Sequence, residues 1–227
     1  MPAHNEEGYL EGSVRSVVAG LRQREADFEV IVVENGSKDA TRLEARDLAS
    51  ALPEVRALEL DVADYGSALR TGFLDAGGET VVNFDVDLVD LGFMDAALEL
   101  MSDPSVVIVI GSKRSPGSED RRPAARRVVT WAFSAVLRHG FGLKASDTHG
   151  LKALRREPLV PIVERCRSGS DIFDTELVLR AERAGLSLRE VPVTVSDLRP
   201  PRTAIASRIP RTLIGLGALW LSMRRDP

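Results

Sequence analysis

The sequence predicts a mainly parallel, doubly wound α/β sheet with helices on its faces, and three observations carry this prediction. Short apolar runs alternate with helical patterns of ten or so residues through the first half of the chain. The apolar run 81–84 ends in two carboxylates one residue apart, Asp85 and Asp87. The 227 residues, of which 44% are hydrophobic, suffice for one domain with a proper core or for one domain with a small appendage.

The elements can be predicted in order from periodicity and turn residues. Apolar residues at helical spacing from Leu10 to Leu21 predict a first helix, after a loop that holds Asn5 and Glu6. Strands are expected at residues 28–33, 55–60, 81–84, 105–111, 151–154 and 186–195. Further helices are expected from 39 towards 52, from 65 to near 76, from about 91 to 101, and over 121–138, 173–184 and 204–223.

Composition and charge limit the classes of protein that fit. The single cysteine, Cys166, excludes a disulfide within the chain and a zinc-type cluster, so a reducing, cytoplasmic location is expected. No signal segment and no apolar stretch long enough to span a bilayer are found. The net charge is −4, yet residues 113–144 hold eight Lys or Arg against two acidic residues, and 199–225 form a second basic region. An anionic partner is expected there, and nucleic acid is not.

The pair Asp85 and Asp87 is the main candidate for chemistry. Two close carboxylates without Cys or His suit a hard divalent cation, Mg²⁺ or Mn²⁺, and the carboxyl ends of strands are where open α/β sheets bind ligands. In the alternative interpretation the two residues only open a turn and cap the helix that starts near Leu91.

Seven segments occur in an order that resembles a known family. They are Pro2 to Glu6, Glu34-Asn35-Gly36-Ser37-Lys38-Asp39-Ala40-Thr41, Gly66 to Gly72, Asp85-Val86-Asp87, Gly111-Ser112-Lys113-Arg114, Asp147-Thr148-His149-Gly150-Leu151-Lys152 and Phe173-Asp174-Thr175-Glu176. Together they resemble glycosyltransferase family 2 enzymes of GT-A fold, and most closely the polyprenyl-phosphate mannose or glucose synthases. The resemblance covers nearly the whole chain and adds support to the metal interpretation of the Asp pair.

The resemblance implies a metal-dependent, inverting hexosyltransferase that takes a nucleotide-diphospho-sugar and passes the sugar to a polyprenyl phosphate at the cytoplasmic membrane face. The implied donor-binding residues are Pro2, Asn5, Glu6, Glu34, Gly66, Arg70 and Asp85, and the implied metal ligands are Asp85 and Asp87. The implied catalytic and acceptor-binding residues are Asp174, Asp147, Arg114 and Arg126. Arg114 and Arg126 lead a group of arginines, with Arg121, Arg122 and Arg127, that can clamp the acceptor phosphate.

Several of these residues also have simpler interpretations. Asn5 can cap a helix, and Glu34 can be a solvated side chain. Arg70 can pair with a phosphate or with a buried carboxylate. His149 suits a hydrogen-bonded spacer better than acid–base catalysis. The two tryptophans, Trp131 and Trp220, suit core or interfacial anchors better than sugar platforms.

The predicted organisation is a GT-A domain over 1–198 and a basic amphipathic tail over 199–227. In the tail, Ile209, Leu213, Leu216, Leu219, Trp220 and Met223 can share one helical side flanked by arginines. This composition suits a helix that lies in a membrane interface, whereas the alternative is a terminal helix that covers the domain's own core.

Three departures from the family pattern also generate expectations. The apolar strand that normally precedes the Pro-Ala-x-Asn-Glu loop is missing, so either the start of the chain is misplaced or truncated, or the sheet lacks a strand beside the nucleotide pocket. Leu88-Val89-Asp90-Leu91 replaces Leu-Gln-His-Pro-Pro, which leaves Asp90 as a possible substitute ligand. The segment 147–150 is one residue shorter than in many relatives, which weakens the acceptor assignment. Two alternatives therefore remain: transfer to a soluble hydroxyl acceptor, or nucleotide-sugar binding with impaired turnover.

Overall fold

The computed structural model describes residues 1–120, 123–169, 172–195 and 205–225. The first elements are β1 (Pro2–Ala3), α1 (Leu10–Gln23), β2 (Val30–Asn35), α2 (Thr41–Ala51), β3 (Val55–Leu60), α3 (Tyr65–Asp75), β4 (Thr80–Asn83), α4 (Leu91–Leu100) and β5 (Val106–Ser112). The chain continues with β6 (Glu119–Asp120), α5 (Ala124–Phe141), β7 (Lys152–Arg155), α6 (Arg156–Arg165), α7 (Phe173–Arg183), β8 (Ser187–Pro192), β9 (Thr194–Val195) and α8 (Ile205–Arg225).

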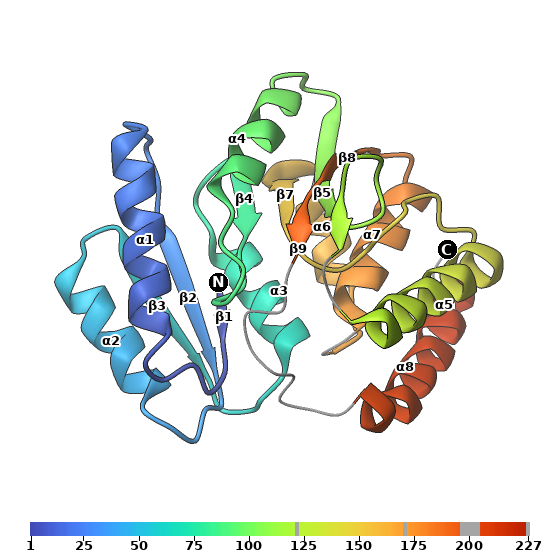
Figure 1. Cartoon of the computed structure of the whole chain (residues 1–227), viewed down its shortest axis with the longest axis horizontal. Helices are drawn as coiled ribbons and strands as arrows, with labels where there is room; N and C mark the ends of the chain where they lie inside the picture. Colours follow the sequence, from blue (N-terminus) through green and yellow to red (C-terminus); the bar gives the residue numbers. More distant parts are fainter. Residues whose placement is uncertain (121–122, 170–171, 196–204, 226–227) are drawn as a thin grey trace.

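The strands form two larger sheets that face each other edge to edge (Figure 1). The first has the order β1-β2-β3 and is parallel throughout, with Pro2 opposite Val33 and Val30 opposite Val55. The second has the order β4-β7-β5-β8, in which β7 runs antiparallel to both of its neighbours and β8 runs parallel to β5. A small parallel pair, β6-β9, is added near the second sheet. The predicted mainly parallel α/β sheet with flanking helices is confirmed.

Two apolar clusters cover the faces of the sheets. One contains Leu10 and Phe93, from α1 and α4, and the other contains Phe73 and Leu177, from α3 and α7. Neighbouring residues of β4 pack against different clusters, and all of β5 is buried. Strands that are covered on both faces are expected to be apolar without alternation, which is what the sequence of the central strands shows.

Two sequence expectations need correction. The two-residue strand β1, which pairs with β2, consists of Pro2 and Ala3 from the predicted loop and is not the apolar strand expected before that loop. Helix α6 was not expected, because Pro161 lies inside it and proline usually ends a helix. Asp90 caps α4, since its Oδ1 accepts a hydrogen bond from the Phe93 N–H at 2.9 Å, and among the described residues it forms no group of three metal-ligating side chains with Asp85 and Asp87.

The single cysteine lies inside the second apolar cluster. Cys166 is the residue that ends α6 and is 4% exposed. Burial, with the nearby charge of Glu176, raises the pKa of its thiol to about 12. At neutral pH this side chain is therefore a protonated, apolar core group.

Candidate active site

The loops at the carboxyl ends of β1 and β2 form the first part of the site. The Asn5 backbone has a left-handed φ of 54°, a conformation that asparagine tolerates well. Its N–H donates to Ser37 Oγ at 3.0 Å, and its Oδ1 accepts from the Lys38 N–H at 2.9 Å. Asn5 does not cap α1, which begins at Leu10. The cap interpretation is therefore wrong, and Asn5 joins the two loops.

Glu34 is fully buried at the end of β2, so the solvated interpretation is also wrong. Its Oε1 accepts from the Ser37 N–H at 2.5 Å, and its Oε2 accepts from Arg42 Nε at 2.7 Å. Burial raises the pKa of this carboxyl, but the bonds to Ser37 and Arg42 outweigh it and hold the pKa below the ordinary glutamate value. Both oxygens of Glu34 are thus engaged within the protein.

Two other predicted donor residues, Pro2 and Glu6, lie in the same loop region. Pro2 is buried in β1, and Glu6 is half-buried. The Glu6 N–H donates to Thr41 Oγ1 at 2.7 Å, which ties this loop to the start of α2. Pro2, Asn5, Glu6 and Glu34 thus lie in two loops that hydrogen bonds join, and these four residues are called the wall below.

Helix α3 carries the predicted residues Gly66 and Arg70. Its N-cap is Asp64, whose side chain accepts from the Ser67 N–H at 2.6 Å, and Gly66 is buried in the first turn. Arg70 Nε donates to the Val163 carbonyl oxygen at 3.3 Å and so links α3 to α6. The partner described for Arg70 is therefore a backbone carbonyl, and the alternative of a buried carboxylate partner is not found among the described residues.

Asp85 and Asp87 lie in a tight turn directly after β4, in which the Leu88 N–H donates to the Asp85 carbonyl oxygen at 3.0 Å. Asp87 is exposed and Asp85 is half-buried. The turn part of the simpler interpretation is confirmed, whereas the capping part is wrong, since Asp90 caps α4. Tyr65 Oη donates to Asp85 Oδ1 at 2.9 Å.

The surroundings of Asp85 carry an excess of negative charge. Burial raises the pKa of its carboxyl, and the charges of Asp174 and Asp87 raise it further, against the lowering effects of Tyr65 and Lys152. Among the described residues no group of three or more His, Cys, Asp or Glu is placed to hold a metal ion. Asp85 and Asp87 carry carboxylate oxygens, the type of donor that hard divalent cations prefer.

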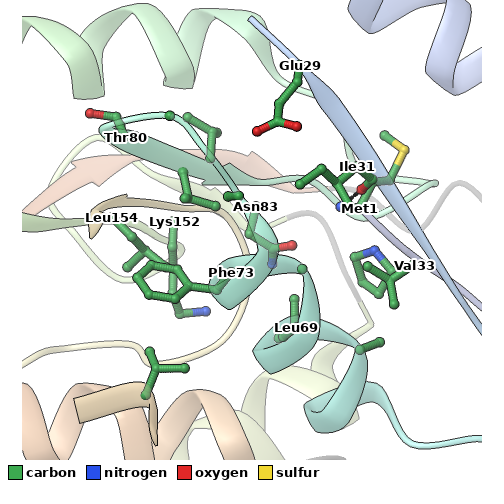
Figure 2. A pocket seen from close by; sticks show the side chains of 18 of the residues that line it. Met1, Glu29, Ile31, Val33, Leu69, Phe73, Thr80, Asn83, Lys152 and Leu154 are labelled. Atoms are coloured by element: carbon green, nitrogen blue, oxygen red, sulfur yellow. Dashed lines mark hydrogen bonds between the residues drawn. The ribbon is translucent and has the colours of Figure 1, made fainter. Parts of the chain in front are cut away.

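Asp174 lies in the first turn of α7 and is 4% exposed. Its partner is Lys152 of β7, whose Nζ lies 2.9 Å from Asp174 Oδ1 and also donates to the Gly150 carbonyl oxygen at 3.0 Å. Lys152 is 1% exposed, so this is a fully buried ion pair. Figure 2 shows Lys152 reaching past Phe73. The charge of Asp174 raises the pKa of Asp85, so these two predicted residues interact electrostatically in the structure.

Asp147 is buried and organises the loop before β7. Its Oδ1 accepts from the N–H groups of Thr148 and His149 at 2.8 and 3.1 Å, and its Oδ2 lies 3.6 Å from Lys113 Nζ. Burial raises the pKa of the Asp147 carboxyl, but Lys113 and the backbone donors lower it below the ordinary value. Thr148 Oγ1 lies 3.1 Å from His149 Nδ1, which agrees with the spacer interpretation.

The predicted acceptor arginines are only partly described. Arg114 follows β5, and its Nη1 is buried without a hydrogen-bond partner among the described residues. Arg126 belongs to α5, but its side chain lies outside the described part of the chain, as do Arg121 and Arg122. Arg127 is exposed on α5.

Sequence reasoning missed Tyr65 and the role of Lys152. A lysine within the apolar strand 151–154 is the signal for Lys152, because a buried ammonium group requires a carboxylate partner. Tyr65 gives no comparable signal, since a tyrosine at the start of a helix is as common in a surface position.

Helix α8 has two apolar stripes where one was predicted. Leu216, Leu219 and Met223 are buried in the second cluster, whereas other apolar residues of the helix are exposed: Leu213, Ile214, Trp220 and Leu221. Helix α5 also exposes apolar side chains, namely Val128, Val129, Trp131 and Val136. Neither tryptophan is a core residue, and the Arg224 guanidinium stacks 3.4 Å from the Trp220 ring. No described helix is both long enough and apolar enough to cross a bilayer.

Several curated proteins resemble the chain in sequence. It is 31% identical over 223 residues to the glycosyltransferase AglD of Haloferax volcanii, a match that covers 96% of this chain and 35% of AglD. It is 25% identical to the dolichyl-phosphate beta-glucosyltransferase ALG5A of Trichomonas vaginalis, covering 92% of this chain and 68% of that protein. The dolichyl-phosphate beta-glucosyltransferase of Drosophila melanogaster is 29% identical, with 87% and 66% covered. The chain thus spans about a third of AglD and about two thirds of the other two relatives.

Solved structures share the fold. Glucosyl-3-phosphoglycerate synthase from Mycobacterium tuberculosis, in complex with UDP, superimposes with a TM-score of 0.70 at 23% identity, covering 100% of this chain and 79% of that one. The mannosyltransferase PcManGT from Pyrobaculum calidifontis, in complex with GDP-Man and Mn²⁺, gives a TM-score of 0.64 at 24% identity, with 100% and 63% covered.

The family assignment rests on a third comparison. The sequence model of glycosyl transferase family 2 matches residues 1–161, which is well over half of the chain. Because this match spans the loops after β1, β2, β4 and β5, and because the fold is that of the GT-A structures above, the chain belongs to glycosyl transferase family 2.

Proposed function

We propose that this protein transfers a hexose, with inversion, from a nucleotide-diphospho-sugar to a polyprenyl phosphate, and that Asp85 and Asp87 hold the divalent metal that the reaction needs. The observation that carries the proposal is the carboxylate pair at the end of β4, close to the buried Asp174. The titles of the similar structures name UDP-glucose, GDP-mannose and Mn²⁺. The names of several relatives include dolichyl phosphate or undecaprenyl phosphate.

The proposed roles follow from the charges in the site. The metal held by Asp85 and Asp87, Mg²⁺ or Mn²⁺, supplies positive charge to the diphosphate leaving group. The wall formed by Pro2, Asn5, Glu6 and Glu34 positions the nucleoside, with Gly66 and Arg70 of α3 beside it. An acceptor oxygen bonds to the anomeric carbon as the bond from that carbon to the diphosphate oxygen breaks, so the configuration inverts.

The acceptor phosphate is proposed to bind the arginines after β5. Arg114 has a buried Nη1 without a hydrogen-bond partner in the described part of the chain, and a guanidinium group with a free donor suits an anionic ligand. Asp147 fixes the neighbouring loop through Lys113. Arg126 is proposed as the second arginine of this clamp. Its inclusion rests on its position in the sequence and on the role proposed for Arg114.

Metal dependence can be tested by calorimetry of nucleoside-diphosphate binding. Asp85→Asn and Asp87→Asn should each weaken binding in the presence of Mn²⁺, and EDTA should weaken wild-type binding to the same level. Asp47→Asn, which changes an exposed carboxylate on α2, is the matched control and should bind normally. Equal affinity of the wild type with and without EDTA would contradict the metal assignment.

The acceptor class can be tested with Asp174→Asn. A hydroxyl acceptor must lose a proton, so removal of a catalytic base should cost about 10²- to 10⁴-fold in rate. A phosphate monoester is largely dianionic at pH 7 and needs orientation instead. Asp174→Asn, made together with Lys152→Met so that no lysine is left buried alone, should keep some activity on polyprenyl phosphate. Arg114→Ala should weaken acceptor use and leave donor binding intact.

If Asp174→Asn abolishes transfer while Arg114→Ala behaves like the wild type, the second candidate is favoured, which is transfer to a soluble hydroxyl acceptor. The observation behind that candidate is the carboxylate of Asp174 near Asp85, which could serve as a base. Donor hydrolysis with metal would exclude the remaining alternative, a binding protein with impaired turnover.

Contact with the cytoplasmic membrane face is proposed for the exposed apolar stripes of α5 and α8. Exposed apolar residues flanked by Arg127, Arg211 and Arg224 suit an anionic interface. Deletion of the tail from Ile209 is a poor test, because it would also remove the buried side chains of α8. Leu213→Ser with Ile214→Ser should reduce co-sedimentation with anionic vesicles and leave stability unchanged. Leu43→Ser, which changes an exposed leucine of α2, is the control, and equal vesicle binding of the wild type and both variants would count against the idea.

A further inference from the structure

Glu190 of β8 lies at the junction of the two loops that carry the proposed acceptor-binding residues. Strand β8 pairs in parallel with β5, and Glu190 lies opposite Ile110 in that register. One loop follows β5 and carries Arg114, and the other precedes β7 and carries Asp147. Glu190 is half-buried, and it belongs to none of the seven sequence segments described above.

The carboxylate of Glu190 accepts hydrogen bonds from both loops. Its Oε1 accepts from the Ser146 N–H at 2.7 Å, and its Oε2 accepts from Ser146 Oγ at 2.9 Å. The same Oε2 accepts from Ser115 Oγ at 3.3 Å. Ser146 directly precedes Asp147, and Ser115 directly follows Arg114. A single carboxylate therefore fixes the two loops relative to each other.

A further serine extends this network to the backbone of Arg114. Ser112 is fully buried at the end of β5, and its Oγ accepts from the N–H groups of Arg114 and Ser115, both at 3.1 Å. A hydroxyl oxygen has two lone pairs and one proton, so these two bonds use both lone pairs of Ser112. The remaining contact, Ser146 Oγ at 2.7 Å, therefore receives the Ser112 proton. Ser146 in turn donates its own proton to Glu190.

This chain of donors requires an acceptor at its end. An ionised carboxylate accepts through both oxygens and donates through neither, so Glu190 sets the direction of every bond back to Ser112. A glutamine there would have one acceptor oxygen and one NH₂ group, and in either orientation the NH₂ would face another donor. The chain cannot simply reverse, because both lone pairs of Ser112 are already in use.

We propose that Glu190 is a positioning residue, which holds the backbone at Arg114 so that the guanidinium group meets the acceptor phosphate. This inference rests on the proposed function, which assigns Arg114 to the acceptor. Glu190 itself contacts neither substrate in this proposal. An arginine side chain has many rotamers, so a fixed backbone at Arg114 limits where its buried Nη1 lies. Small displacements of a group that orients a substrate can cost much of the rate.

The test is Glu190→Gln, with Glu182→Gln as the matched control. Glu182 of α7 is also half-buried, and it accepts from the N–H groups of Lys144 and Ala145 at 2.9 and 2.7 Å. It thus binds the same loop before β7, but these two bonds do not reach the loop after β5. The two variants therefore make the same chemical change at two places on one loop.

Glu190→Gln should raise the KM for polyprenyl phosphate by roughly tenfold, with kcat little changed and with normal calorimetric binding of nucleoside diphosphate and Mn²⁺. Glu182→Gln should keep the wild-type KM. Hydrogen exchange, which requires no activity, should become faster at the Arg114 and Ser115 amides in Glu190→Gln alone. Ser112→Ala should raise the KM as Glu190→Gln does, and the double variant should raise it no further, because both act through one chain of bonds.

The outcomes separate this inference from the proposed function. If the wild type transfers sugar to polyprenyl phosphate and Glu190→Gln keeps the wild-type KM, Glu190 does not position the acceptor. Weaker donor binding in Glu190→Gln, or an equal rise in KM in Glu182→Gln, would indicate general loosening and would also overturn the inference. Absence of transfer by the wild type would contradict the proposed function itself. Exchange at the Arg114 and Ser115 amides would then decide alone whether Glu190 holds the loop.

Discussion

The two sides of the site are built differently. On the β1–β2 side, polar groups satisfy one another: Glu34 has Ser37 and Arg42, and Asn5 has Ser37 and Lys38. On the β4–β7–α7 side, two carboxylates, Asp87 and Asp174, act on Asp85. The single ammonium group of Lys152 offsets only part of their negative charge. The first side can hold its shape without a ligand. On the second side the nearby carboxylates raise the pKa of Asp85, and the metal proposed above would offset their charge.

The comparison predicts that the buried pair on the second side is the more fragile. Lys152→Met should leave the Asp174 carboxylate buried without a partner and destabilise the fold by about 3–5 kcal/mol in denaturant unfolding. Adding Asp174→Asn should recover most of the loss. Arg15→Met, which breaks the exposed pair with Glu11, should cost less than about 1 kcal/mol. Equal losses for Lys152→Met and Arg15→Met would show that the burial of the pair has no energetic weight.

A smaller effect is expected on the first side. Arg42→Ala should destabilise the fold less than Lys152→Met, because Glu34 keeps its bond from the Ser37 N–H and the arginine is 35% exposed. The pKa of Glu34 is lowered in the folded protein, so its stabilising effect is present above the ordinary glutamate pKa of about 4.3 and is lost as the pH falls below it. Unfolding at pH 7 and pH 3 should therefore show a larger difference between wild type and variant at pH 7. The same difference at both pH values would contradict this account of Glu34.

The smallest expected change in stability comes from removal of the hydrogen bond between Tyr65 and Asp85. Tyr65→Phe removes the hydrogen bond to Asp85 and should weaken metal-supported nucleoside-diphosphate binding by roughly tenfold, about 1.4 kcal/mol, with little loss of stability. Tyr9→Phe is the control, because Tyr9 is 54% exposed in the loop before α1. A Tyr65→Phe variant that binds like the control would mean that Asp85 is positioned by its turn alone.

Much of the fold could be predicted because its signals are local. Apolar runs and turn residues predicted the longer strands and most helices, and the segment 151–154 was correctly predicted as a strand, whereas the two-residue strands β1 and β6 were not predicted. Helix α6 was missed because its stability comes from burial of Leu159, Ile162 and Val163, which outweighs the cost of Pro161. The second apolar stripe of α8 was missed because helical spacing does not say which stripe meets the core.

Only those site residues that belong to short sequence motifs could be predicted from the sequence. The carboxylates Asp85, Asp87 and Asp174 were found from the sequence, since their motifs are local. Their partners Tyr65 and Lys152 lie about 20 residues away from them in the chain or on another strand, and only the fold brings them together. The roles proposed for all of these residues remain predictions.

The burial of Cys166 also makes the protein convenient for site-specific labelling. A thiol with a pKa of about 12 inside the core reacts slowly with maleimide at neutral pH, so the native chain offers almost no background. A cysteine introduced at Trp131 or Ile214 would then be the single reactive group. A fluorescent or spin probe there would report whether the exposed stripes of α5 and α8 enter lipid, and a probe at exposed Val62 would serve as the reference.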